Sequence, residues 1–252
     1  AHTVTTLNLS LHADIHIAVQ SDSPIGCGLG SSASLIVSVM QAIANHFGVQ
    51  PAQSWYDQQA TKLENLQHAR SSGVDPYICL RGGCHLFQQG QARQVAPPTF
   101  PLMLVHTGRP SIGTGACVLQ VKNRCGNSSI WSEFAQVTNS LCCALQQQDQ
   151  HACQQAIRHN HQLLNSLGVV PKPVAQFIAN VQQQGAAAKI CGAGATQGQG
   201  GGMVWVLADH PSLVHRLCRN QGYSYLNAAA YMRPAHASTI SLWQNQPSLY
   251  EE

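Results

Sequence analysis

Apolar and polar residues alternate along residues 7–19 of this chain. Leucine, alanine, isoleucine and valine hold the odd positions from Leu7 to Val19, and polar side chains hold the even positions except at Ala18. A period of two is typical of a half-buried β-strand. We therefore predict a strand or a strand pair here, which runs directly into the glycine-rich stretch SPIGCGLGSSAS at residues 23–34.

Helical patterns follow this stretch. SASLIVSVMQAIANHFG reads as a buried helix that Gly48 ends, and Pro51 stands where a second helix begins, which reaches about Ala69. The turn RSSGVDP and a short apolar segment, YICLRGGCHLF, come next. The polar, proline-rich stretch QQGQARQVAPPTF after them is the best candidate for a domain boundary, so we divide the chain at residue 98.

The second half mixes strands and helices. Three segments read as strands: PLMLVHTGR, AAAKIC and MVWVLA. The last two flank the glycine-rich loop GAGATQGQGGG, and one or two further strands are expected at the end of the chain. Helical patterns cover residues 111–122, 129–148, 150–167, 172–184 and 211–220. The order predicts an α+β fold in two layers.

Composition narrows the class of protein. The 252 residues are 44% hydrophobic and 9% charged, which indicates a globular chain. The net charge is +3 with scattered Lys and Arg, so we expect neither a nucleic-acid nor a membrane partner. Ten cysteines without zinc-type spacing predict reduced, mostly buried thiols in a cytoplasmic protein. No apolar stretch reaches the roughly 20 residues that span a bilayer.

The first glycine-rich stretch is a candidate anion site. A strand, a glycine-rich loop and a helix N-terminus in this order can hold phosphate on backbone N–H groups. Gly26, Gly28 and Gly30 leave the backbone bare, and Ser31 and Ser32 can cap the helix or coordinate Mg²⁺. The spacing is neither that of a Walker A loop nor that of a dinucleotide motif. On composition alone, a phosphate cradle and a tight structural turn remain equally favoured.

The complete string Pro-x-Gly-x-Gly-Leu-Gly-Ser-Ser-Ala, residues 24–33, resembles the second motif of the GHMP kinases. That superfamily includes galactokinases, homoserine kinases, mevalonate kinases and phosphomevalonate kinases. Lys189-Ile-Cys-Gly192-Ala-Gly194, followed by more glycines and a strand, is similar to the third motif of the family. Residues 195–199 depart from mevalonate kinases, in which the glycines continue directly.

The stretch between the two motifs matches mevalonate kinases in register, at Glu64, His68, Ser72, Gly73, Val74, Asp75, Gly82 and Gly83. Ala69 and Ser71 replace the usual Gly and Pro. The likeness spans nearly all of the chain. It implies a two-layer GHMP kinase fold, with an N-terminal α/β nucleotide-binding domain over 1–98, which retains one strand and its helices, and a ferredoxin-like α+β domain over 99–252.

The resemblance also implies roles for single residues. Asp75 would be the general base or the orienter of the acceptor hydroxyl, and the structural alternative is an Asx turn or a helix cap before Pro76, which Asp75 can also form. Glu64 and Ser32 would hold Mg²⁺, whereas Glu64 without the motif reads as a solvated helix residue. The residues implied to hold the ATP phosphates are Gly26, Gly28, Leu29, Gly30, Ser31, Ser32, Gly192 and Gly194, and those implied to face the substrate are Ser72, Thr114 and His68.

The implied activity is ATP-dependent phosphorylation of the 5-hydroxyl of mevalonate for isoprenoid precursor synthesis. The alternatives are another GHMP kinase acting on phosphomevalonate, a sugar or another small alcohol, and a silent relative that binds ligand and regulates a partner. The lysine motif near the start of these kinases has no match in the 22 residues before Ser23, so the N-terminal part is expected to lie outside this sequence. Homodimerisation is left open.

Overall fold

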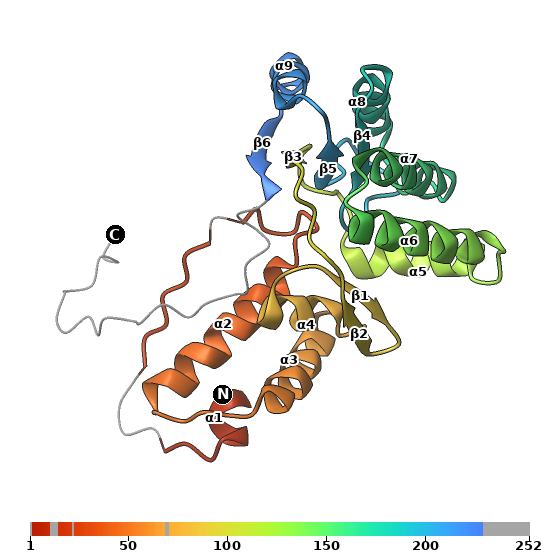
Figure 1. Cartoon of the computed structure of the whole chain (residues 1–252). Coiled ribbons are helices and arrows are strands. Elements are labelled where there is room, and N and C mark those ends of the chain that lie inside the picture. The colour runs from red at the N-terminus through yellow and green to blue at the C-terminus, as the bar shows by residue number, and fades with distance from the viewer. Residues whose placement is uncertain (1, 11–14, 22, 69–70, 229–252) are drawn as a thin grey trace.

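A computed structural model describes residues 2–10, 15–21, 23–68 and 71–228 of the chain. Its N-terminal half is built from helices α1 (His2–Thr6), α2 (Ser31–His46), α3 (Gln53–His68) and α4 (Val74–Arg81). Figure 1 shows α2, α3 and α4 gathered at one end of the molecule. They enclose a small core of four buried side chains, Val37, Met40, Ala60 and Leu80.

The helices predicted after the first glycine-rich stretch are confirmed. Helix α2 starts at Ser31, and the N–H of Phe47 closes its last turn on the carbonyl of Ile43. Gly48 then adopts a φ of 65°, the left-handed conformation that ends many helices. Helix α3 begins two residues after Pro51, at Gln53.

The strand predicted over residues 7–19 is wrong. Residues 2–6 form helix α1, and residues 7–10 and 15–21 contain no strand, while residues 11–14 lie outside the described part of the chain. The apolar side chains of Ile15, Ile17 and Val19 are exposed by 36%, 42% and 59%. Alternation sets which side chains share a face, but a strand also needs a neighbour for its backbone hydrogen bonds. No described strand pairs with this segment.

The middle of the chain contains two elements that the sequence pattern did not predict. Helix α4 begins at Val74, inside the predicted turn, and the hairpin of β1 (His85–Gln88) and β2 (Gln91–Gln94) follows it. Gln88 pairs with Gln91, so the hairpin turns on Gln89 and Gly90 alone. Both residues have positive φ, as such a two-residue turn requires. The hairpin begins at His85, in the apolar segment, and extends into the segment predicted as a boundary, residues 88–100. The division at residue 98 stays a prediction.

The second half is an antiparallel sheet with helices. Strands β3 (Leu102–His106), β4 (Ala187–Ile190), β5 (Met203–Leu207) and β6 (Ser224–Asn227) pair in the order β4-β5-β3-β6. In chain order this is the arrangement 2-3-1-4 of a ferredoxin-like sheet. The helices are α5 (Thr114–Cys125), α6 (Ile130–Gln147), α7 (Gln150–Ser166), α8 (Lys172–Gln183) and α9 (Pro211–Gln221). The predicted α+β class and these helices are confirmed, with α5 starting three residues late.

The two faces of the sheet pack on different parts of the chain. Alternate residues such as Val105 and Val206 belong to a core shared with α5, α8 and α9. The other face, including Leu104 and Met203, packs on α6 and α7 and also on the first glycine-rich stretch and the hairpin. Figure 1 shows the hairpin between the N-terminal helices and the sheet. This second core therefore fixes the first glycine-rich stretch against the sheet.

The cysteines are all free, as expected, and five of the ten are buried: Cys27, Cys117, Cys142, Cys153 and Cys218. Within the described ranges, no helix has the length and apolar character needed to cross a membrane.

Candidate functional site

The two glycine-rich segments, far apart in the sequence, meet in the structure. We call residues 23–30 the first loop and residues 191–202 the second loop. A methyl group on Gly28 would lie 2.8 Å from the backbone nitrogen of Gly192, and one on Gly192 would lie 2.8 Å from the Cα of Gly28. The backbones therefore touch where neither residue carries a side chain, so any side chain here would push the loops apart.

The start of strand β5 joins the two loops. The N–H of Met203 donates to the carbonyl of Cys27 at 2.8 Å, and the carbonyl of Met203 accepts from the N–H of Cys191 at 2.9 Å. One residue of the sheet thus bonds to the first loop with one backbone group and to the second loop with the other. This arrangement holds the contact between Gly28 and Gly192 in register with the sheet.

The first loop has the geometry of an anion cradle. Gly26, Gly28 and Gly30 all have positive φ, at 73°, 86° and 66°, where other residues are strained. The Ser31 hydroxyl accepts a hydrogen bond from the N–H of Gly26 at 3.1 Å, which closes the loop on itself. Gly30 is the N-cap residue of α2, and it offers no side chain to bond the first N–H groups of the helix. The first N–H groups of α2 therefore lie at the loop, where an anion would be favoured by the helix dipole.

Two acidic residues lie next to the first loop. A methyl group on Gly30 would stand 3.8 Å from the Cγ of Asp75, which lies in the first turn of α4, and 3.7 Å from the Sγ of Cys79. Burial, together with the charges of Asp75 and Glu64, raises the pKa of the Cys79 thiol to about 12. The charges of both carboxylates therefore act on Cys79, whose sulfur lies at the end of the first loop.

Glu64 is buried, so the interpretation of this residue as a solvated helix position is wrong. Its side chain is only 4% exposed, although α3 as a whole is polar. The Ser71 hydroxyl donates a hydrogen bond to its carboxylate and accepts one from the N–H of Gly73 at 3.0 Å. A buried carboxylate of this kind needs such donors or a cation.

The donor set fits a magnesium ion in chemical character. Mg²⁺ prefers carboxylate and hydroxyl oxygens together with phosphate oxygens and water. The charge of Glu64 acts on Cys79, whose sulfur lies next to Gly30 of the first loop, and Ser32 is the second residue of α2. Within the described part of the chain, no group of three or more His, Cys, Asp or Glu side chains could hold a metal ion.

The second loop is packed more tightly than the first. A methyl group on Gly194 would lie 2.0 Å from the carbonyl oxygen of Val169, and methyl groups on Gly200 and Gly202 would lie 2.6 Å from backbone oxygens. Ala195 also donates its N–H to Val169 at 2.9 Å. Gly194 is therefore required by packing whether or not a phosphate binds to it.

Residues 195–199, where the sequence departs from mevalonate kinases, are fixed against α5 and the segment before it. The Thr196 hydroxyl donates to Gln120 at 2.6 Å, and the Ser111 hydroxyl donates to the carbonyl of Gln197 at 2.7 Å. Two residues before them, the carbonyl of Ala193 accepts from the Cys117 thiol at 3.2 Å. The segment is held by contacts along one side of α5.

The three residues predicted to face the substrate lie in different surroundings. Ser72 is exposed, and its hydroxyl accepts from the N–H of Val74, the first residue of α4, at 3.4 Å. It is separated from Asp75 by two residues. Thr114 is exposed at the start of α5, whose next turns contact the second loop. His68 ends α3, and its side chain lies outside the described part of the molecule.

Two side chains at the loops were missed by sequence reasoning. Cys27 is 3% exposed, and its sulfur lies 3.2 Å from Nε2 of His106, the last residue of β3. Arg109, three residues further on, lies against Gly26. Of the two, only Arg109 closely follows a buried strand, β3, and the ends of strands often carry functional residues. No comparable sequence signal marked Cys27.

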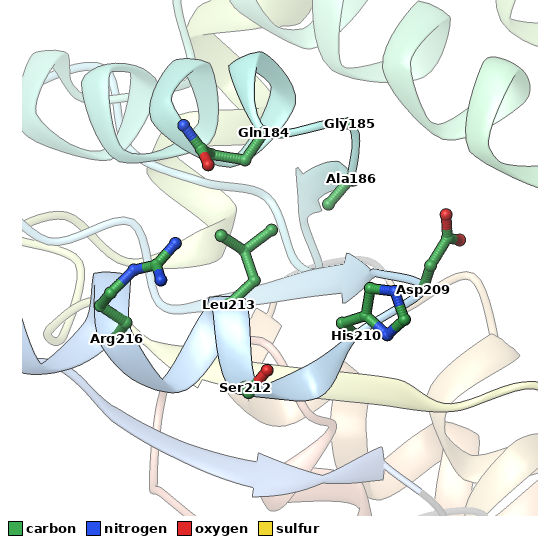
Figure 2. Close-up of a pocket in the computed structure, with 8 residues that line it drawn as sticks. All are labelled: Gln184, Gly185, Ala186, Asp209, His210, Ser212, Leu213 and Arg216. Carbon is green, nitrogen blue, oxygen red and sulfur yellow. The ribbon is translucent and has the colours of Figure 1, made fainter.

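A pocket of about 310 Å³ lies at the other end of the sheet, where β5 ends rather than where it begins. Figure 2 shows its lining, Gln184, Gly185, Ala186, Asp209, His210, Ser212, Leu213 and Arg216. Leu213 and Arg216 project from α9 toward the segment that carries Gln184. The Asp209 carboxylate accepts from the side chains of Gln150 and Gln154. This pocket shares none of its residues with the loops.

Comparison with known proteins supports the resemblance on which these residues were selected. Residues 2–83 match the family described as "GHMP kinases N terminal domain". Over these residues the chain is similar to the N-terminal domain of the GHMP kinases. The resemblance stated from its motifs is confirmed.

Several mevalonate kinases from archaea are similar to the chain. The chain is 30% identical to that of Archaeoglobus fulgidus over 76% of its own length and 64% of the relative. It is 26% identical to that of Thermococcus sibiricus over 77% and 60%. A mevalonate kinase crystal structure superposes with a TM-score of 0.76 at 20% identity, covering 89% of this chain and 72% of the other. The fold is shared, and the chain spans about 60% of the length of such relatives.

Proposed function

We propose that this chain is the larger part of an ATP-dependent kinase that phosphorylates the 5-hydroxyl of mevalonate. The observation that supports the proposal most strongly is the contact between Gly28 and Gly192. It brings together the two loops that the resemblance assigns to the nucleotide phosphates, with Asp75 beside the first loop. The similarity to archaeal mevalonate kinases favours mevalonate among the possible acceptors.

The first loop and the start of α2 would hold the phosphates. Backbone N–H groups at a helix N-terminus bind anions through their partial positive charge. The positive φ angles of Gly26, Gly28 and Gly30 keep this backbone in shape before any ligand arrives. Such preorganised donors stabilise charge that develops during phosphoryl transfer without a further cost of reorganisation.

Asp75 would act on the acceptor hydroxyl. It is exposed in the first turn of α4, and its carboxylate lies close to Gly30 at the end of the first loop. From there it would orient the hydroxyl toward the terminal phosphate and accept its proton. Magnesium, when bound by Glu64 and Ser32, would supply charge neutralisation of the phosphate oxygens. The Ser71 hydroxyl would keep the Glu64 carboxylate in place.

The test is ADP release by the full-length protein with mevalonate, phosphomevalonate, galactose or homoserine as the acceptor. We expect turnover with mevalonate and a loss of about 10²- to 10⁴-fold in Asp75→Asn, because that range is typical of a general base. The matched control is Asp209→Asn, at the opposite end of the sheet, which should retain full turnover.

Each outcome bears on the proposal. Turnover of a different acceptor would overturn the choice of mevalonate, and ATP binding without turnover of any acceptor would overturn the assignment as a kinase. An unchanged rate in Asp75→Asn would remove Asp75 from the site. Glu64→Gln should raise the magnesium concentration for half-maximal rate by about tenfold, since losing one charge-assisted contact is worth that much.

A further inference from the structure

Arg109 contacts both loops. A methyl group on Gly200, in the second loop, would lie 2.6 Å from the carbonyl oxygen of Arg109, so the backbone of this residue packs directly on the second loop. Its guanidinium lies on the first loop, because a methyl group on Gly26 would stand 3.2 Å from Nε and 3.6 Å from Cζ. Arg109 is thus held at its base by one loop and reaches the other with its charge.

The backbone before Arg109 is fixed as well. Thr107 donates its N–H to the carbonyl of Gly202 at 3.0 Å, and its hydroxyl donates to the same carbonyl at 2.7 Å. Gly202 in turn donates its N–H to Gly108 at 2.9 Å. These bonds continue the pairing of β3 with β5 beyond the strand ends. The position of Arg109 is therefore set by the sheet and is not that of a free loop residue.

The charge of Arg109 has no protein counter-ion within the described ranges. The ion pair found there joins Arg81 to Asp57, at a distance of 2.7 Å, and Arg109 takes part in none. Its side chain is exposed, and its charge opposes the rise that burial causes in the pKa of the Cys27 thiol. An arginine without a carboxylate partner, resting on a cradle for anions, has the chemistry to bind a phosphate.

We propose that Arg109 binds the terminal phosphates of the nucleotide at the start of the first loop, while Asp75 and Glu64 lie at its end. This inference rests on the proposed function and adds a residue to it. The placement separates charges in the way phosphoryl transfer requires, with a cation on the phosphate oxygens and a carboxylate at the acceptor. The planar guanidinium offers several donors to those oxygens at once.

The experiment compares ATP with adenosine in the full-length protein. Binding of each is measured by calorimetry for wild type, Arg109→Met, Arg109→Lys and the control Arg93→Met, in which an exposed arginine of β2 is changed. We expect Arg109→Met to weaken ATP binding by about 10- to 100-fold, the value of a charge-assisted contact, and to leave adenosine binding unchanged. Arg109→Lys should lie between it and wild type, and Arg93→Met should match wild type.

The outcomes separate the inference from the function on which it rests. Wild type that binds neither ATP nor adenosine overturns the proposed function. Wild type that binds ATP, together with an Arg109→Met variant that binds it equally well, overturns the role of Arg109 alone. A parallel loss of ATP and adenosine binding in Arg109→Met, with no rescue by Arg109→Lys, would show a structural role and also overturn the inference.

Discussion

The two loops use glycine for different physical reasons. In the first loop, Gly26 and Gly30 have positive φ, but a methyl group on either would meet only side-chain atoms, 3.2 Å away or more. In the second loop, methyl groups on Gly194, Gly200 and Gly202 would lie within 2.6 Å of backbone oxygens. The first loop therefore needs glycine mainly for its backbone conformation, and the second mainly for space.

This difference suits the first loop to ligand binding and the second loop to packing. A backbone in the left-handed conformation with open space beside it can offer its N–H groups to a ligand. A backbone pressed against other backbone supports its neighbours and has less room for a ligand. Gly28 and Gly192 combine both features at the point where the loops touch. Substitution at chosen glycines can test this division.

The largest effect is expected for Gly194→Ala. The added methyl group would overlap the carbonyl of Val169 at 2.0 Å, and φ is +67°, so we expect a loss of about 3–5 kcal/mol in the free energy of unfolding. Gly185→Ala is the control, because φ there is +89° with no atom within 4 Å, and should cost about 1–2 kcal/mol. Urea denaturation measures both, and equal losses would contradict the role of packing.

Gly28→Ala should have the next largest effect. Its methyl group would lie 2.8 Å from Gly192, and φ is +86°, so we expect a loss of about 2–4 kcal/mol and weaker ATP binding. Gly192→Ala should cost less, because no left-handed strain accompanies it. In the double variant the second methyl group should cost less than it does alone, since the first has already separated the loops. Strict additivity would argue against direct contact.

Gly30→Ala should lower stability by about 1–2 kcal/mol, the cost of the left-handed conformation alone. Gly48→Ala is the matched control, with nearly the same φ and open space beside it, at the other end of α2. Thermal unfolding should report similar losses for the two variants. Calorimetry with ATP should distinguish them, because only Gly30 lies at the proposed phosphate site. Equal ATP affinities would place the phosphates elsewhere.

The smallest expected effect concerns pH. Burial raises the pKa of the Cys191 thiol in the second loop to about 11 from 9.0. The unfolded chain therefore releases this proton at lower pH than the folded chain does, and stability falls as pH rises from about 9 to about 11. Cys191→Ala should flatten that fall by about 1 kcal/mol per pH unit. Urea denaturation across this range tests it, and exposed Cys143→Ala should leave the slope unchanged.

Much of the fold follows from local patterns, and its failures have physical causes. Helices α6 to α9 and strands β3 to β5 were predicted because long amphipathic periods and short apolar runs are strong signals. The segment around Ile15 and Ile17 has the period of a strand, but no described strand lies beside it. The hairpin of β1 and β2 was missed because Gln89 is a rare residue for a turn with positive φ.

The candidate site, like the fold, was predicted only in part from local sequence patterns. The sequence by itself determined which segments carry bare backbone and which acidic residues, Glu64 and Asp75, accompany them, since those signals are local in the chain. The tertiary structure decided that Gly28 touches Gly192, that Glu64 is buried and that Arg109 spans both loops. Contacts between distant segments depend on how the sheet and helices pack, because no local pattern specifies which two backbones will approach each other.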